Sequence, residues 1–535
     1  MGAAAGVREA WIATTLPYVV LLAPFLFSHI PPLVDYPNHL ARFWLIGGGH
    51  SGPLAQFYGL DWSRAATNVG VDWIVSLLAG VAPPMSVAHL AVIVAVLLTP
   101  AGAAALNGAL FRRPSTWWAL LPLAGWSGTM LLGFLNFQLG LGMALAFAAV
   151  DAVVQPRRPA AAIALRIGFA AVLIWVHLLD MFFYAALLAA VAFGAERLEW
   201  REALTGQGSD RRSLAARFGR AAAAAAWCLA PLAAFLLFAH ALPAVSNVGG
   251  LHFGAFAAKL RALASPLIGY DVMLDLPLAI AAGALVTALA RRGRLQAHAG
   301  LCFAAGAFLA LAVLAPDEVG DSSWLDARFA LMGLLCLLSG LSLAPWTGAR
   351  ERRAVALAAL VLISVRTLDI ACSWARMQPS LAATEQVIAE LPEGARILPM
   401  QHRPTIRDRL RAPVGRYLFS VGDATFTHYS LLAVPQRHAY VPTLFALRGK
   451  QPLEIRPRWA ACSAPDGGRL VSVNSLGQRP GPKDPAYMDR WRSCFDYIVV
   501  LNADLPDAGG PFVPPPGVTL VADRGFAQLW RISPQ

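Results

Sequence analysis

The chain alternates between long apolar stretches and short, arginine-rich loops up to about residue 370. Each stretch holds about 20 residues, the length of a helix that crosses a hydrocarbon core of about 30 Å. Lipid offers no hydrogen-bond partner to free backbone groups, so these stretches are expected to be helices. The pattern predicts about eleven transmembrane helices. They lie near residues 11–29, 86–110, 116–132, 134–153, 160–176, 178–195, 220–240, 275–290, 297–315, 327–345 and 353–370.

The pattern changes after residue 370. Residues 381–391 have helical spacing, and several short β-rich stretches follow. The last two flank Asp523-Arg524-Gly525, a hairpin signal. We therefore predict a transmembrane domain at residues 1–370, with an external loop at 30–85, and a small α/β domain at 371–535. The expected strands lie at residues 396–400, 497–501, 518–522 and 527–532.

The distribution of charge assigns sides to these segments. The chain has a net charge of +12 although only 14% of its residues are charged. Most of the arginines fall in alternate loops, and by the positive-inside rule those loops are cytoplasmic. This predicts a bacterial inner-membrane protein with a cytoplasmic N-terminus and a periplasmic C-terminal domain. It also explains the positive charge without nucleic acid as a partner, since no nucleic-acid motif is present.

The first segment is expected to stay in the mature protein. Residues 11–29 exceed the apolar core of a signal peptide, and no small-residue cleavage site follows them. The external loop that comes next is rich in aromatic residues, which predicts short helices at headgroup depth.

That loop begins His-Ile-Pro-Pro-Leu-Val-Asp-Tyr-Pro-Asn-His-Leu-Ala-Arg, residues 29–42. Prolines stiffen the backbone on both sides of Asp35. A carboxylate held rigidly at the membrane surface suits a general base for a hydroxyl. Arg42 can pair with a phosphate, with His39 beside it and Tyr36 in support. Alternatively, Asp35 caps a helix and Arg42 binds lipid headgroups.

A third external loop, residues 317–326, leads into the span that starts with Arg328. An arginine at this boundary can hold a lipid phosphate bidentately, and Asp326 can orient it. The other reading is snorkelling of Arg328 to the interface. The acidic residues Asp317, Glu318 and Asp321 can bind a divalent cation or form a solvated loop.

Other polar residues lie at the external ends of spans. His177 and Asp180 are one helical turn apart, and they either support an acceptor site or bond between helices. Lys259 and Arg261, with His252, can contact a pyrophosphate or a headgroup.

The C-terminal domain carries further histidines. The spacing of His402, His428 and His438, with Asp423, fits no zinc motif. The aromatic stretch at residues 428–444 can rest over a cavity of the membrane domain. Cys462 and Cys494 can form a disulfide if the domain is periplasmic, but the sequence does not supply the geometry.

This architecture resembles the GT-C superfamily of membrane glycosyltransferases. The shared features are many spans, an external first loop with an early acidic residue, interfacial loop helices and an external C-terminal domain. The run Pro-Pro-Leu-Val-Asp-Tyr-Pro-Asn-His-Leu-Ala-Arg also looks like uncharacterised bacterial proteins of this type. The resemblance implies a polyprenyl-phosphate-linked sugar as donor and Asp35 as the catalytic base. The acidic pair common in the superfamily is absent, since Tyr36 follows Asp35, so dependence on a divalent cation stays open.

The favoured hypothesis is an inverting sugar transfer to a glycolipid, polysaccharide or protein acceptor, with Arg328 and Arg42 stabilising the departing phosphate. Membrane lipid is an expected partner, and no further cofactor is. A transporter or flippase is one alternative, although it would need polar groups near the bilayer midplane. A non-catalytic assembly or sensor protein, which would not need the Asp35 loop, is the other.

Overall fold

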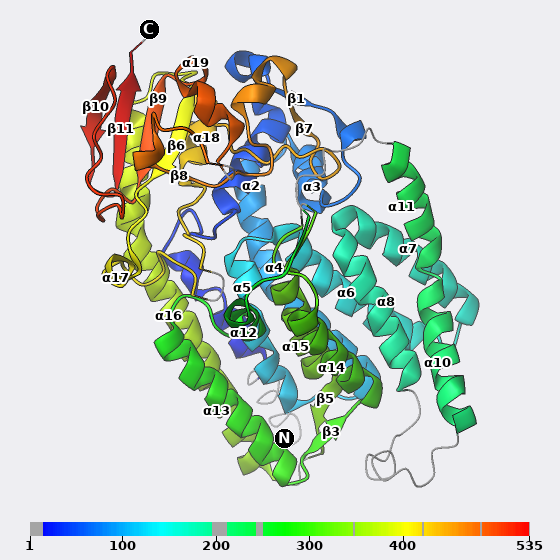
Figure 1. The fold of residues 1–535 in the computed structure, drawn as a ribbon. Helices are drawn as coiled ribbons and strands as arrows, with labels where there is room; N and C mark the ends of the chain where they lie inside the picture. The colour runs from blue at the N-terminus through cyan, green and yellow to red at the C-terminus, as the bar shows by residue number, and fades with distance from the viewer. Residues whose placement is uncertain are drawn as a thin grey trace.

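The computed structural model describes residues 14–194, 211–241, 250–320, 322–345, 348–419, 422–481 and 484–533. A bundle of helices makes up one end of the molecule, and a sheet with short helices and loops covers the other (Figure 1).

Apolar helices dominate the bundle. Among the described residues, five helices are long and apolar enough to cross a membrane, and a bent pair at residues 214–238 raises this to six. The five are α4 (Pro84–Phe111), α6 (Leu135–Val154), α7 (Pro159–Val176), α13 (Val272–Arg291) and α16 (Ala349–Ala389). The bent pair lies in α10 (Arg211–Ala226) and α11 (Leu229–Ala241), and shorter helices include α8 (Leu178–Phe193), α14 (Ala299–Leu314) and α15 (Leu325–Gly340). These helices indicate a membrane protein.

One predicted span is not a continuous helix. Residues 116–132 form the 3-10 helix η5 (Thr116–Ala124) and the short helix α5 (Gly128–Leu131). The proline at 122 and the glycines at 125 and 128 interrupt regular helix here. The buried Arg366 of α16 donates to the carbonyl oxygens of Leu123 and Trp126, at 3.1 and 2.8 Å. Irregular backbone at membrane depth needs this enclosure by protein. Each of the other predicted stretches overlaps a helix of the described residues.

Helix α16 joins the bundle to the sheet. It runs without a break from Ala349 to Ala389, so the predicted domain boundary after residue 370 falls inside a helix. The helix expected at residues 381–391 is the last part of α16, which packs against β11 and the short helix α18 (Ala433–Arg437). The two parts of the chain therefore share one rigid element.

The sheet has five strands in the order β10-β11-β9-β6-β8. Strand β6 is parallel to β8 and β9, and β11 is antiparallel to β9 and β10. Four of the strands coincide with the expected stretches to within a residue at either end. The strands are β6 (Ile397–Gln401), β8 (Val471–Ser472), β9 (Tyr497–Leu501), β10 (Val518–Asp523) and β11 (Ala527–Ile532).

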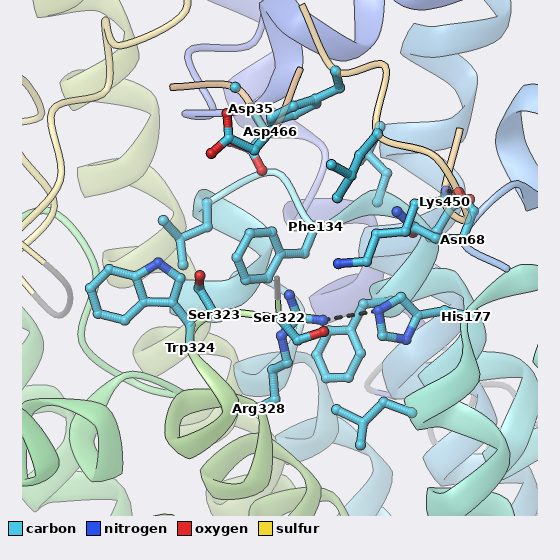
Figure 2. A pocket seen from close by; sticks show the side chains of 18 of the residues that line it. Asp35, Asn68, Phe134, His177, Ser322, Ser323, Trp324, Arg328, Lys450 and Asp466 are labelled. Carbon is cyan, nitrogen blue, oxygen red and sulfur yellow. Dashed lines mark hydrogen bonds between the residues drawn. The ribbon is translucent and has the colours of Figure 1, made fainter. Parts of the chain in front are cut away.

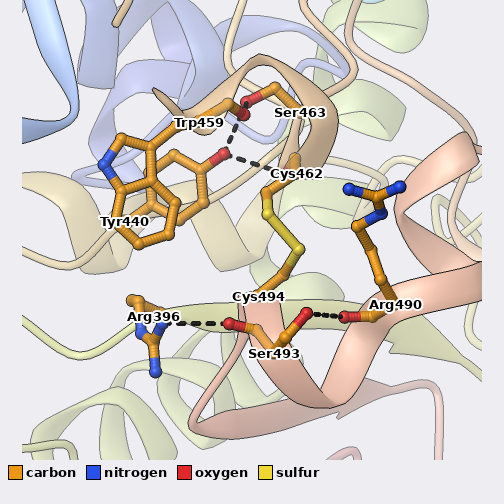
Figure 3. Close-up of a disulfide and its surroundings, with 8 residues drawn as sticks. All are labelled: Arg396, Tyr440, Trp459, Cys462, Ser463, Arg490, Ser493 and Cys494. Atoms are coloured by element: carbon orange, nitrogen blue, oxygen red, sulfur yellow. Dashed lines mark hydrogen bonds between the residues drawn. A yellow bond between two sulfur atoms is a disulfide. The ribbon is translucent and has the colours of Figure 1, made fainter. Parts of the chain in front are cut away.

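A disulfide joins Cys462 to Cys494, at the ends of two short helices beside this sheet (Figure 3). The hydroxyl of Tyr440 donates to the carbonyl oxygen of Cys462 at 2.9 Å, so the bridge is held in the aromatic core around Trp459. The structure thus settles a pairing that the sequence left open.

The first loop and the C-terminal part interlock. The loop holds α2 (Tyr36–Trp44), α3 (Gly70–Leu78) and strand β1 (Tyr58–Leu60), which pairs antiparallel with β7 (Leu453–Ile455). Short helices were expected in this loop, and it contains α2, α3 and shorter 3-10 and π-helical segments. Together, the loop and the C-terminal part form one layer over the ends of the bundle helices (Figure 1).

Candidate functional site

A cavity of about 620 Å³ lies between that layer and the bundle (Figure 2). The turn before α2 forms one side, the ends of α6, α8 and α15 form the floor, and residues 423–468 form part of the roof. Its charged and imidazole side chains come from segments far apart in the sequence. They are Asp35, His39, His177, Arg328, Asp423, His428, Lys450 and Asp466.

Asp35 occupies the turn just before α2. It stands at the N-cap position, but its carboxylate accepts no capping hydrogen bond from the helix. Its backbone N–H donates to the carbonyl oxygen of Leu132 at 2.9 Å. Gly133 faces it with a φ of +88°, and a Cβ added there would lie 3.1 Å from the Cβ of Asp35. The turn therefore presents the carboxylate to the cavity instead of to the helix.

His428 lies next to this carboxylate. Its Nε2 is 3.5 Å from Oδ1 of Asp35, and its Nδ1 is 3.4 Å from the amide nitrogen of Asn38. The orientation of the Asn38 amide is fixed, because its oxygen accepts from Phe445 N and its nitrogen donates to Thr443 O, both at 2.9 Å. An amide nitrogen only donates, so Nδ1 of His428 accepts. The imidazole hydrogen is therefore on Nε2, directed towards Asp35.

His39 supports the same turn from α2. Its Nε2 lies 3.1 Å from the carbonyl oxygen of Gly133. Burial, and then the positive charge of Arg42, lower the pKa of His39 well below its usual value. The ring is neutral at physiological pH and donates to Gly133, so its contribution is to position the turn.

Arg328 lies on the floor of the cavity. Its guanidinium carbon is 4.3 Å from the ring centre of Phe134 and 4.9 Å from that of Phe137. One terminal nitrogen donates to Nε2 of His177 at 3.0 Å, and Nε has no hydrogen-bond partner among the described residues. Aromatic faces attract a cation without neutralising it. Arg328 therefore keeps its charge, and its second terminal nitrogen makes no hydrogen bond to the described residues, whereas Nε is shielded from solvent.

His177 connects Arg328 to Asp180. Arginine only donates, so Nε2 of His177 accepts and the hydrogen is on Nδ1. That Nδ1 is 3.5 Å from a carboxylate oxygen of Asp180, which is fully buried behind it. The structure brings together the predicted residues Arg328, His177 and Asp180, on the opposite side of the cavity from Asp35.

Three charged residues of the cavity, Asp423, Lys450 and Asp466, were not predicted as part of the site. Burial, and then the charge of Asp35, raise the pKa of Asp423 to about 6. Asp466 also lines the cavity, and the amino group of Lys450 points into it (Figure 2). The aromatic stretch starting at His428 was expected over a cavity, and His428 does line this one. No pattern around Lys450 marks it, because it follows a glycine in an irregular segment.

Arg42 and Tyr36 do not line the cavity. Arg42 makes a bidentate ion pair with Asp72 of α3, at 2.6 and 3.1 Å, and both side chains are fully buried. Tyr36 is also buried, away from the lining. The prediction that Arg42 binds phosphate is corrected, because two of its nitrogens bind Asp72 and the whole side chain is buried inside the protein. The alternative of headgroup binding fails for the same reason.

Further candidates from the second and third external loops also lie outside the lining. Asp326 does not orient Arg328, because it pairs with Lys259 at 3.2 Å and both are buried. Arg261 is exposed on α12 (Phe256–Ala264). In the acidic loop, Asp317 pairs with His252 at 2.9 Å, and Asp321 is outside the described residues. Within the described ranges, no three His, Cys, Asp or Glu side chains are arranged to hold a metal ion.

Comparison with known proteins adds little to this geometry. No protein-family model matches the chain, and no curated protein matches it either. Among solved structures, the crystal structure of ArnT from Cupriavidus metallidurans in the apo state is similar over 100% of both chains, with a TM-score of 0.43 and 13% sequence identity. Likeness at this level defines neither reaction nor substrate, so the function has to come from the cavity.

Proposed function

We propose that this protein transfers a sugar from a polyprenyl-phosphate donor to an extracytoplasmic acceptor, as a GT-C type glycosyltransferase. The observation that carries the proposal is that Asp35 and Arg328 line the same cavity, on opposite sides of it. A transfer of this kind needs a base for the acceptor and a cation for the phosphate that leaves.

The two charges divide the reaction between them. Asp35 takes the proton of the acceptor hydroxyl while the oxygen attacks the anomeric carbon. The bond between that carbon and the phosphate oxygen breaks, and the electron pair leaves with the polyprenyl phosphate. Arg328 donates to the phosphate as its negative charge grows, and Lys450 adds a second positive charge. The proton accepted by Asp35 balances the new charge on the phosphate.

The apolar part of the cavity suits an isoprenoid donor. Leu178, Leu179 and Phe182 from the start of α8, and Phe329 from α15, line it. Phe182 is 47% exposed and lines the cavity, so a large apolar side chain stays accessible on this wall. A phosphate bound at Arg328 therefore lies close to a path for its own apolar tail.

Two imidazoles hold the charged groups in place without neutralising them. His428 faces the carboxylate of Asp35 with a hydrogen, and His177 accepts from Arg328. Orienting partners of this kind make a base or a clamp effective, because they fix its geometry before the substrate arrives.

Replacing the base tests the proposal. Purified protein in lipid nanodiscs is incubated with radiolabelled polyprenyl-phosphate sugars and a lipid or glycan acceptor. Asp35→Asn should lower transfer at least about 100-fold, the typical contribution of a general base. Asp61→Asn is the matched control, since Asp61 caps a turn in the same loop outside the cavity.

The outcomes separate the alternatives. A normal unfolding temperature for Asp35→Asn together with lost transfer supports the assignment. Normal turnover by Asp35→Asn overturns Asp35 as the base. Movement of an intact lipid-linked sugar across the bilayer, with no transfer to any acceptor, replaces the enzyme with a flippase.

A further inference from the structure

A short segment away from the cavity combines exposed apolar side chains with exposed arginines. Helix α17 (Ile406–Arg409) projects beside α16, between the sheet and α13 (Figure 1). Ile406 and Leu410 are 83% and 84% exposed, and Phe419 is 44% exposed. Residues 405–419 are called the interfacial hook below. Large apolar side chains gathered at a surface mark a contact with a partner or a membrane.

The depth of the interfacial hook is fixed by two contacts with the bundle. Gly415 packs against Ser373 and Met377 of α16, just beyond the apolar stretch that ends near residue 370. The backbone N–H of Phe419 donates to the carbonyl oxygen of Gly269 at 3.2 Å, directly before α13 begins. The hook therefore lies level with the end of the apolar part of α16 and with the start of α13, on the side where the sheet is.

The exposed polar side chains of the hook are mainly basic. Arg407, Arg409 and Arg411 are all exposed around Ile406 and Leu410. Asp408 lies between them, and its carboxylate accepts from Thr405 at 2.7 Å and pairs with Arg411 at 3.4 Å. The guanidinium of Arg409 lies 5.0 Å from the ring centre of Tyr417. Arginine and aromatic side chains around exposed aliphatic residues are typical of a surface that binds lipid headgroups.

We propose that the interfacial hook docks onto the membrane leaflet on the sheet side. Ile406 and Leu410 enter the boundary between headgroups and acyl chains, and the three arginines bind the phosphates of anionic phospholipids. The depth, the exposure and the charge of the segment carry this proposal together. It requires that the apolar helices cross a membrane, but it does not depend on the sugar transfer proposed above.

A depth measurement tests the apolar part. Leu410→Cys and Val513→Cys each receive a nitroxide label in nanodiscs, and the signal of the labelled parent protein is subtracted. Val513 is the control, because it is 81% exposed in the C-terminal part. The Leu410 label should collide with oxygen and be shielded from a water-soluble nickel chelate, whereas the Val513 label should show the reverse. Equal access of both labels to the chelate overturns insertion.

A charge exchange tests the lipid contact. The triple variant R407Q/R409Q/R411Q is compared with R458Q/R479Q/R490Q, which removes the same charge from exposed positions elsewhere in the C-terminal part. Native mass spectrometry counts the phosphatidylglycerol molecules retained from nanodiscs of phosphatidylglycerol and phosphatidylcholine. The hook variant should retain at least twofold fewer, with the control unchanged and inorganic phosphate unable to compete. Equal retention by the two triples overturns the headgroup contact, as does displacement of the lipid by inorganic phosphate.

Discussion

The protein contains the same pair of charges in two different arrangements. Arg42 and Asp72 meet in a closed bidentate pair, and both side chains have 0% exposure. Arg328 and Asp35 instead line opposite sides of one cavity, and each faces a histidine. The first arrangement neutralises itself inside the protein, whereas the second leaves a cation and an anion for a ligand to bridge.

The difference shows why residue type and position along the chain are insufficient to identify a phosphate site. Both arginines were predicted on the external side, Arg42 in the loop after the first span and Arg328 at the start of a later one, and both were expected to bind phosphate. What separates them is the partner, a carboxylate for Arg42 and a neutral imidazole with two aromatic rings for Arg328. A buried ion pair supports the fold, while a cation over aromatic faces remains available.

Breaking the closed pair should have the largest effect. Arg42→Met leaves Asp72 buried without its partner, which typically costs about 3–5 kcal/mol of stability. Denaturation of the purified protein by SDS would measure the loss. Arg42→Met/Asp72→Leu should recover much of it, because no charge is then left unpaired. A stable Arg42→Met variant that has lost sugar transfer would instead assign Arg42 to the substrate.

Replacing Arg328 should lower the rate of sugar transfer more than it lowers the stability of the fold. Arg328→Gln should lower kcat about 10²–10³-fold, the usual loss for one donor to a developing anion. Arg328→Lys should restore part of the rate, since it returns the charge but not the fork. Unfolding curves serve as the control for both variants. If Arg328→Gln keeps its rate and loses stability, Arg328 belongs with the structural pair.

The carboxylate of Asp35 is expected to depend on the imidazole of His428 for its orientation. A hydrogen bond to a charged group is worth about 1.5–3 kcal/mol, so His428→Leu should lower kcat roughly 10-fold to 100-fold. His428→Gln keeps a donor that can face Asp35 and should retain more of the rate. Comparing kcat with KM, and the pH profiles of the two variants, distinguishes this positioning effect from loss of fold. Equal rates for both variants would show that Asp35 needs no donor from the C-terminal part.

The smallest expected effect is on the pH dependence of stability and concerns Asp423, which makes no bidentate pair among the described residues like that of Asp72 with Arg42. Burial, and then the charge of Asp35, raise the pKa of Asp423 from 3.8 to about 6. Between these pH values the folded state binds the extra proton, so wild-type stability falls as the pH rises through the window. Asp423→Asn should therefore be more stable than wild type at pH 7.5, and the difference should vanish near pH 4. Unfolding midpoints at both pH values check this, and a constant difference would contradict it.

Local patterns predicted most of the elements. The length of the apolar stretches predicted helices such as α4, α6 and α7, and the β-rich stretches predicted β9 and β11 at their observed positions. Proline and glycine in residues 116–132 interrupt a stretch whose hydropathy alone resembles a span. High hydropathy predicts that a stretch is buried, but it does not distinguish burial in lipid from burial in protein. This stretch is buried by protein, and Arg366 donates to two of its carbonyl oxygens.

The sequence by itself determined most of the apolar helices and four strands of the C-terminal sheet, because each depends on a few neighbouring residues. Only the tertiary structure decided that Asp72 closes on Arg42, and that His428 and Lys450 enter the cavity. His428 meets Asp35 through the packing of the C-terminal part on α2, where Asn38 bonds to Thr443 and Phe445. Contacts between segments so far apart follow from how the elements pack, which no local periodicity contains.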